Sequence, residues 1–231
     1  MHELSYTLLN GIVEDLRASN THVNYFKNIE QFKKVSGLAA IVQAAAGEPG
    51  AIHSEQAATS DGDPVTGFAM NVGGKLVTGS FWKVGFKDGD VVQVVGYQKI
   101  NEFIAVAVVD VKEKKIWMQP HSERGTIAKK YHLLKCCGYA FIALYMLAIL
   151  AALFGGIPVW FMLICATFST PIILFLTVGL SWKDFMWFSK EMNRLGAALA
   201  IAEPEKIDLF KSTKKVRKSG KPALPMGVYY L

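Results

Sequence analysis

Residues 136–154, CCGYAFIALYMLAILAALF, and residues 159–180, VWFMLICATFSTPIILFLTVGL, decide the fold expected for this chain. Neither stretch contains Asp, Glu, Lys, Arg or His. As α-helices they would rise about 28 and 33 Å, which matches the hydrocarbon core of a bilayer at about 30 Å. The two stretches therefore predict two transmembrane helices, because buried helices of soluble proteins rarely run this far without a polar face.

The linker between the two stretches is Gly155-Gly156-Ile157-Pro158. Glycine is common at helix ends and proline at helix starts, so the linker predicts a tight hairpin within residues 129–182. Small residues at every fourth position would let the helices approach closely, Trp160 would lie at the membrane interface, and Pro171 would bend the second helix. The residues expected to shape this membrane hairpin are Cys136, Ala148, Ala152, Gly155, Gly156, Pro158, Trp160, Pro171 and Leu180.

Basic residues flank both stretches, whereas the linker carries no charge. The residues expected to contact lipid headgroups are Lys129, Lys130, Lys135, Lys183, Lys190 and Arg194. By the positive-inside rule, both termini are therefore expected on the cytoplasmic side. Residues 1–4 do not open a basic region followed by an apolar stretch, so no signal peptide is expected.

The apolar content is higher than is usual for a soluble enzyme and too high for a disordered tail. The 231 residues include 25 Lys and Arg against 19 Asp and Glu, and 52% of them are hydrophobic, against about 45–50% apolar residues in soluble domains. Cys136, Cys137 and Cys165 all lie in apolar runs and show no C-x-x-C spacing. This pattern excludes a secreted disulfide framework and a cysteine zinc site.

Residues 1–128 contain strand-length apolar runs separated by turn sequences. The expected strands cover residues 4–15, 22–29, 65–72, 75–82, 91–96, 102–110 and 115–119, with Gly73-Gly74 as a hairpin turn. Such a series predicts a small sandwich or a partly open barrel. The expected fold class is a membrane α+β protein with a small cytoplasmic β-barrel or sandwich head and a two-helix transmembrane hairpin.

Three further segments complete the expected organisation. Residues 35–46 predict a short apolar helix that packs on the head, lies at the membrane surface, or inserts and self-associates. Residues 47–64 predict a mobile loop. Residues 183–231 predict an amphipathic helix and a basic cytoplasmic tail, with a last strand at 226–231 that could add to the head. The tail has few aromatics among its basic residues, so nucleic acid is not an expected partner.

The chain has no motif with the spacing of a catalytic or metal site. Gly73-Gly74-Lys75 differs from a phosphate-binding loop, because Ala69 stands in place of the first glycine and Leu76 follows the lysine. The histidines show no paired spacing. No catalytic residue, metal or cofactor is therefore expected, and the chain is predicted not to be an enzyme.

The densest polar cluster is residues 120–125, PHSERG. Its simplest interpretation is a junction that ends the last strand of the head and positions the first membrane helix. Trp82, His121 and Arg124 are the residues proposed for weak contact with a partner protein. Acid–base chemistry at His121 would require partners that sequence spacing does not reveal.

Several motifs together resemble a bacterial membrane-protein family described as putative type VI secretion system effectors. The motifs are Val77-x-Gly79-x-Phe81-Trp82, Phe86-Lys87-Asp88-Gly89-Asp90-x-Val92, Ile116-Trp117-Met118-x-Pro120-His121-x-x-Arg124-Gly125, Ile207-Asp208-Leu209-x-Lys211-x-Thr213-Lys214-x-x-Arg217 and Gly227-Val228-Tyr229-Tyr230. The resemblance covers most of the chain after about residue 65 and implies a setting in contact-dependent killing between bacteria. It adds no catalytic residue.

These observations lead to one main hypothesis and two alternatives. The first is a non-enzymatic protein of the bacterial inner membrane in a type VI effector or immunity system, which either binds a cognate toxin or inserts into a target membrane. The second is a general oligomeric membrane scaffold that recruits a cytoplasmic partner through its head. The third is an enzyme on a lipid or envelope substrate that uses His121 and Arg124. The expected partners are the bilayer, a cognate effector or immunity protein, and further copies of this chain.

Overall fold

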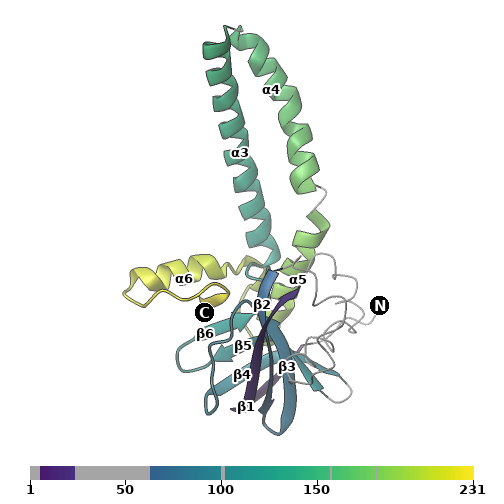
Figure 1. Cartoon of the computed structure of the whole chain (residues 1–231), viewed down its shortest axis with the longest axis vertical. Coiled ribbons are helices and arrows are strands. Elements are labelled where there is room, and N and C mark those ends of the chain that lie inside the picture. The colour runs from purple at the N-terminus through teal and green to yellow at the C-terminus, as the bar shows by residue number, and fades with distance from the viewer. Residues whose placement is uncertain (1–5, 24–62, 100–101, 157, 180–181) are drawn as a thin grey trace.

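A computed structural model describes residues 6–23, 63–99, 102–156, 158–179 and 182–231 (Figure 1). The strands are β1 (Thr7–Val23), β2 (Asp63–Val72), β3 (Lys75–Phe81), β4 (Val91–Lys99), β5 (Glu102–Asp110), β6 (Lys115–Met118) and β7 (Val228–Tyr230). The helices are α3 (Thr126–Gly155), α4 (Val159–Leu174), η2 (Phe175–Gly179), α5 (Trp182–Ala198), η3 (Pro204–Lys206) and α6 (Leu209–Lys218). The expected helix at 35–46, nearly all of the loop at 47–64, and Leu180 lie outside the described residues.

Five strands of the head close into a barrel. The sheet runs in the order β3-β2-β1-β4-β5, and a parallel pairing of β3 with β5, at Val77↔Phe103 and Thr78↔Ile104, joins its two ends. Five strands in this order, with the first strand shared between two neighbours, have the connectivity of an OB barrel. Of the two architectures expected for the head, a sandwich or a partly open barrel, the structure has the barrel, and this barrel is closed.

Strand β1 differs from the sequence prediction. One continuous strand replaces the expected break after residue 15. Residues 7–12 pair with β4 and residues 13–23 pair with β2, with a bulge between Glu14 and Arg17 and a left-handed φ of 52° at Asp15. A bulge bends a strand without ending it, so the polar residues that resembled a turn remain in the sheet.

The turn between β2 and β3 agrees with its prediction. Gly73 and Gly74 have φ values of 55° and 74°, and they follow the last ladder pair, Val72↔Lys75. Two consecutive positive φ values define the tight turn that matches the twist of a hairpin, and glycine adopts them without steric cost.

The strands β2 to β6 are largely buried on both faces of the sheet, whereas β1 is exposed along most of its length. Side chains inside the barrel include Phe68, Met70, Val77, Phe81, Val94, Phe103, Ala105 and Val108. A second core on the outer face includes Val95, Ile104, Val106, Ile116 and Met118 together with Met192 and Leu195 of α5, Leu209 of α6 and Tyr229 of β7. The successive residues Phe103 and Ile104 thus point into different cores, as the two-residue period of a strand requires.

The C-terminal segment is also part of the head. The predicted last strand is present as β7, which pairs with β6 through Trp117↔Val228 and Ile116↔Tyr229. The hydroxyl of Ser212 in α6 donates to the Tyr230 carbonyl at 2.7 Å. Residues before α3 and residues after α4 therefore build one folded body, from which the two apolar helices project (Figure 1).

The two apolar helices differ in length. α3 is long and apolar enough to cross a membrane, whereas α4 has 16 residues and is the shorter apolar helix. Of the two full-length spans expected from the sequence, the structure therefore supports one, α3. Pro171 lies inside α4 and supplies no backbone N–H, and the helix passes into the π-helical turn η2 after Leu174.

The contact between α3 and α4 uses small and hydroxyl side chains. Ala152 of α3 and both Ala166 and Thr170 of α4 are buried, and the hydroxyls of Tyr145 and Thr167 are 2.6 Å apart. Gly156 ends α3 in a left-handed conformation, with a φ of 65°. Of the expected small-residue stripe, only Ala152 is fully buried, because Ala148 is half-buried and Gly156 is exposed at the tip.

Candidate functional site

Two chain segments join at the foot of α3. Residues 123–125 and 207–209 run antiparallel, with an isolated bridge between Arg124 and Asp208. The backbone N–H of Gly125 donates to the Ile207 carbonyl at 2.9 Å, and the N–H of Leu209 donates to the Glu123 carbonyl at 3.1 Å. The start of α3 is therefore attached by main-chain hydrogen bonds to the segment that leads into α6.

The residues packed around the N-terminus of α3 restrict which side chains fit there. A Cβ atom at Gly125 would lie 2.3 Å from the Pro204 carbonyl oxygen, so only glycine fits there without a backbone shift. Asn193 of α5 accepts a hydrogen bond from the Thr126 N–H at 3.1 Å and donates to the Thr126 hydroxyl at 3.0 Å. This reciprocal pair satisfies one of the free donors at the N-terminus of α3.

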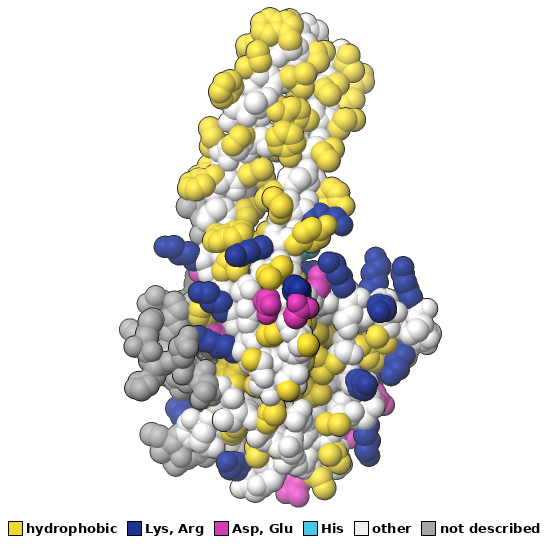
Figure 2. All heavy atoms as spheres, turned by 180° about the vertical axis from the view of Figure 1, so that it is seen from behind, with side chains coloured by type: hydrophobic (Ala, Val, Ile, Leu, Met, Phe, Trp, Pro, Cys, Tyr) yellow, Lys and Arg dark blue, Asp and Glu magenta, His cyan; other side chains and the backbone are white. Residues whose placement is uncertain are grey.

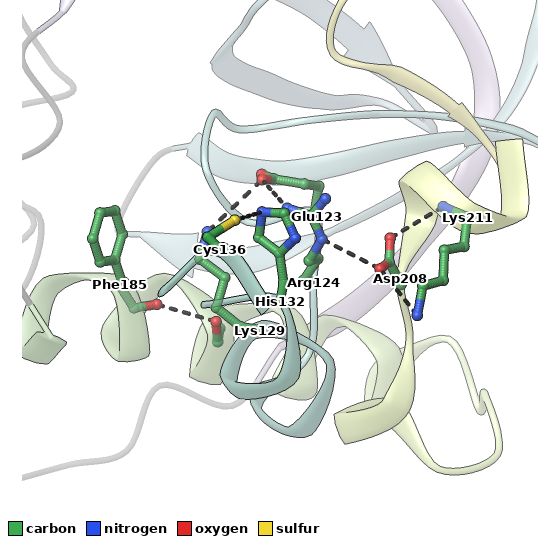
Figure 3. Close-up of polar contacts among 9 residues, drawn as sticks. Glu123, Arg124, Lys129, His132, Cys136, Phe185, Asp208 and Lys211 are labelled. Carbon is green, nitrogen blue, oxygen red and sulfur yellow. Dashed lines mark hydrogen bonds and ion pairs between the residues drawn. The ribbon is translucent and has the colours of Figure 1, made fainter. Parts of the chain in front are cut away.

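Arg124 and Asp208 form the central ion pair of the junction (Figure 3). The Arg124 Nε lies 3.3 Å from the Asp208 Oδ2, and the two side chains are only 12% and 8% exposed. The guanidinium also lies 4.4 Å from the ring centroid of Phe210. Asp208 caps α6, because its Oδ1 accepts from the Lys211 N–H at 3.1 Å.

Lys129 belongs to the interior of the junction and not to its surface. Its ammonium lies 3.9 Å from the Glu123 carboxylate and 5.2 Å from the ring centroid of Phe185, and the residue is only 6% exposed (Figure 3). Burial lowers the pKa of Lys129, which lies outside the uncharged span 136–154. The expected headgroup contact of Lys129 is therefore wrong, because α3 turns this side chain toward α5.

The other basic residues proposed for headgroup contact lie at the surface. Lys130, Lys135, Lys183 and Lys190 are exposed. Arg194 is half-buried, and it donates to the Glu191 carboxylate at 2.7 Å. Glu191 in turn accepts a hydrogen bond from the hydroxyl of Tyr6, so Arg194 is tied to the head.

A basic pocket of about 270 Å³ opens beside the foot of α3. It is lined by Arg124, Tyr131, His132, Lys135, Asp208, Phe210, Lys211 and Lys214. These residues come from the segment before α3, from the first turns of α3 and from the start of α6. Burial, followed by the charges of Arg124 and Lys129, lowers the pKa of His132.

Positive charge dominates the lining of the basic pocket. Four of its residues are cationic, and the carboxylate of Asp208 is the acidic group among the lining residues. Lys211 lies 3.9 Å from Asp208, and its ammonium is 5.3 Å from the Tyr131 ring centroid. Within the described ranges, neither Lys135 nor Lys214 forms an ion pair with an acidic side chain. The arrangement is suited to binding an anionic group.

Trp82 and His121, two of the predicted partner contacts, lie together but away from the basic pocket. Their ring centroids are 5.7 Å apart, and the His121 Nε2 lies 2.8 Å from the Asp63 Oδ2. His121 also contacts Phe188 of α5, at 5.4 Å between centroids. Neither Trp82 nor His121 lines the pocket, so the third predicted contact, Arg124, belongs to a different site.

Comparison with known proteins found no match to this chain among protein-family models, curated proteins or solved structures. These comparisons identify no type VI secretion effector family, so the expected resemblance to that family remains a prediction. Among the residues that the structure describes, no group of three His, Cys, Asp or Glu side chains is placed to hold a metal ion.

Sequence reasoning missed most of the pocket. Tyr131, His132, Asp208, Phe210, Lys211 and Lys214 were not proposed as site residues. Two local signals were present: Tyr131 and Lys135 are four residues apart, Lys211 and Lys214 are three apart, and both spacings place side chains on one helix face. The fold brings these faces of α3 and α6 together at Arg124, and no local sequence pattern predicts this meeting.

Proposed function

We propose that this protein is a non-enzymatic, membrane-anchored β-barrel protein whose α3 and α4–η2 segments cross the bilayer as a hairpin. The observation that carries the proposal is the exposure of apolar side chains on the projecting helices. Phe154, Phe168 and Leu147 are 89, 73 and 63% exposed, and apolar side chains cover the whole length of the column (Figure 2). In water this surface costs about 25 cal/mol for each Å² left exposed, and in lipid it costs nothing.

The connectivity of the head supports a hairpin in preference to a single span. The strands before α3 and the segments after η2 share one core, in which Met192 and Leu195 pack against Ile104. A chain that crossed the bilayer once would separate these segments on opposite sides of the membrane. Two crossings keep the head on one side, which is why we assign a membrane role to the shorter helix as well.

The length of the second segment is compatible with this assignment. The 16 residues of α4 rise about 24 Å at about 1.5 Å each, and η2 continues directly from α4 for five residues. The combined segment approaches the core thickness of about 30 Å, and bilayers thin locally around short spans at modest cost.

Basic residues around the foot of the helices support the orientation. Lys and Arg side chains gather there, below the apolar column (Figure 2). The tip at Gly155, Gly156 and Pro158 carries no charge. The positive-inside rule then assigns the head and the C-terminal segment to the cytoplasmic face of the inner membrane.

The motif resemblance supports a type VI effector or immunity system as the setting. Two of the quoted motifs meet in the junction, where Arg124 pairs with Asp208. The polar side chains there are engaged with one another, as are His121 and Asp63, which favours a binding role over a catalytic one. The head would bind a cognate protein at the membrane, or the hairpin would insert into the membrane of a target cell.

Cysteine accessibility tests the anchor. In a variant that carries Ala at Cys136, Cys137 and Cys165, a single cysteine is introduced as Gly155→Cys at the exposed tip or Lys218→Cys in α6. We expect an impermeant maleimide to label the tip in intact spheroplasts and α6 only after permeabilisation. Lys87→Cys, in the loop between β3 and β4, is the matched control and should behave like Lys218→Cys. Recovery of the full chain without detergent, or labelling of all three positions in intact spheroplasts, would overturn the proposal.

Expression of the gene alone tests the setting. Collapse of the membrane potential would assign the protein to attack, whereas growth combined with protection from a neighbouring toxin gene would assign it to immunity. Growth without protection, in cells that carry the whole locus, would remove the type VI part of the proposal and favour a general membrane scaffold.

A further inference from the structure

We propose that the basic pocket binds the phosphate group of an anionic phospholipid headgroup. This inference rests on the proposed membrane anchor, because the pocket lies at the depth of the lipid headgroups only if α3 crosses the bilayer. The pocket is the one formed by Arg124, the first turns of α3 and the start of α6.

The depth of the pocket along α3 matches a headgroup. Its lining residues on α3 end at Lys135, and the uncharged run begins at the next residue, Cys136. If the run from 136 to 154 fills the hydrocarbon core, Lys135 lies at the phosphate layer of one leaflet. α6 extends sideways from this level (Figure 1), so Lys211 and Lys214 would lie near the same layer.

The charges in the pocket fit the singly charged phosphodiester of a phospholipid. Arg124 offers a planar set of N–H donors, and Lys135, Lys211 and Lys214 offer ammonium groups. The Asp208 Oδ2 lies 3.3 Å from the Arg124 Nε and 3.9 Å from the Lys211 ammonium. The carboxylate thereby pairs with two of the cations, while the ammonium groups of Lys135 and Lys214 remain without an acidic partner in the described part of the chain.

The size and walls of the pocket favour a headgroup over a single small ion. The pocket has a volume of about 270 Å³. The rings of Tyr131 and Phe210 line the pocket beside the cations. These rings would contact the glycerol and ester atoms that adjoin a phospholipid phosphate, whereas inorganic phosphate has no atoms to cover them.

α6 provides a matched pair of variants. Lys211 and Lys214 line the pocket, whereas Lys215 and Lys218 lie on the same helix, are exposed and do not line it. The double variants Lys211→Gln/Lys214→Gln and Lys215→Gln/Lys218→Gln remove the same charge from the same helix. Any difference between them therefore reports the position of the charge and not its amount.

The experiment titrates the full chain, purified in a neutral detergent, with phosphatidylglycerol, and counts bound lipid by native mass spectrometry. We expect saturable binding that weakens about tenfold or more when Lys211 and Lys214 are replaced, because each cation near an anionic lipid contributes about 1 kcal/mol. Replacement of Lys215 and Lys218 should change binding much less. Equal losses in the two double variants, or equal binding of phosphatidylcholine, would overturn the inference.

Two further arms separate the possible sources of the phosphate and the two proposals. If inorganic phosphate binds without lipid and displaces phosphatidylglycerol, the pocket serves a soluble phosphate compound, and the lipid inference is wrong. If the cysteine labelling supports the anchor but the lysine variants bind lipid normally, only this inference fails. If the chain is soluble without detergent and still binds inorganic phosphate at Lys211 and Lys214, the membrane proposal and this inference both fail, while the anion chemistry of the pocket stands.

Discussion

Arg124 and Asp208 are 84 residues apart in the chain, yet they form a largely buried ion pair with 3.3 Å between the Nε and Oδ2 atoms. Arg124 immediately precedes the residues that start α3, and Asp208 caps α6. The pair therefore couples the direction of the projecting helix to the basic helix beside it. Loss of either charge would leave the other buried without its partner.

The first prediction concerns this pair. Asp208→Asn keeps a capping oxygen for α6 but removes the charge opposite Arg124, so we expect a loss of about 2 kcal/mol in the free energy of unfolding. Thermal unfolding of the detergent-purified protein, followed by circular dichroism, measures it. Glu203→Gln, which removes an exposed ion pair with Lys206, is the control and should leave the melting curve nearly unchanged. A similar effect of both substitutions would contradict the assignment.

The second prediction concerns the close approach at Gly125. Gly125→Ala places a Cβ atom 2.3 Å from the Pro204 carbonyl oxygen, so we expect a loss of about 2 kcal/mol or more in stability. At Gly138 an added Cβ meets no atom within 4 Å, and alanine favours a helix by about 1 kcal/mol over glycine. Gly138→Ala should therefore be neutral or stabilising in the same unfolding experiment. Normal stability of Gly125→Ala would mean that the junction is looser than described.

The third prediction concerns alkaline pH. Burial, followed by the charges of Glu191 and Glu102, raises the pKa of Tyr97 from 10.0 to about 12. The folded state retains a proton that the unfolded chain releases, so stability is complete below pH 10 and falls as the pH rises toward 12. The maximal loss is about 2.7 kcal/mol, at about 1.36 kcal/mol for each pKa unit. Tyr97→Phe should reduce this loss without affecting stability at pH 8.

Urea unfolding at a series of pH values tests the Tyr97 prediction. Tyr131→Phe removes an exposed hydroxyl and serves as the control, with an alkaline loss equal to that of the unsubstituted chain. Burial also raises the pKa of Tyr6 and Tyr229, so some alkaline loss should remain in Tyr97→Phe. An unchanged slope in Tyr97→Phe would contradict the prediction.

The fourth prediction concerns the contact between α3 and α4. The hydroxyls of Tyr145 and Thr167 are 2.6 Å apart, and such bonds between membrane helices contribute about 0.6 kcal/mol on average. A double-mutant cycle of Tyr145→Phe and Thr167→Val should give a coupling energy of this size. Coupling near zero would mean that the two helices do not pack in this register inside a membrane.

The fifth prediction uses the neighbouring hydroxyl. Within the described residues, the buried Thr170 Oγ1 has no hydrogen-bond partner. Thr170→Val keeps the shape and removes the unpaired polar atom, so we expect a small gain in stability, about 1 kcal/mol. Destabilisation by Thr170→Val would show that the hydroxyl has a partner in the membrane, such as a lipid carbonyl or a second copy of the chain.

The local elements of this fold were readable from the sequence. The two glycines at 73 and 74 predicted a hairpin turn, and the apolar run of residues 102–110, followed by a charged turn, predicted the strand that the structure has at those positions. Both signals are local, because they depend on φ preferences and on a short apolar run that ends at a turn. The exclusion of charge from 136–154 likewise predicted one long apolar helix.

The contacts that assemble the fold were not readable. Barrel closure depends on the parallel pairing of Val77 with Phe103, and no local pattern in either strand encodes a parallel partner. Lys129 resembles its exposed neighbour Lys130 in sequence, and only the packing of α5 separates their environments. The basic pocket is similarly invisible, because Arg124, Lys135 and Lys211 converge from three segments.

Pairing of β6 with β7 has a consequence for biosynthesis. The partner of Ile116 is Tyr229, which leaves the ribosome only after both apolar helices have been translated. Until then the outer edge of β6 presents free N–H and carbonyl groups, which other strands can pair with. If the helices insert into a membrane, as proposed, their delivery to the insertion machinery precedes completion of the sheet, and a chain delayed at that step exposes the unpaired edge of β6 to strands of neighbouring chains.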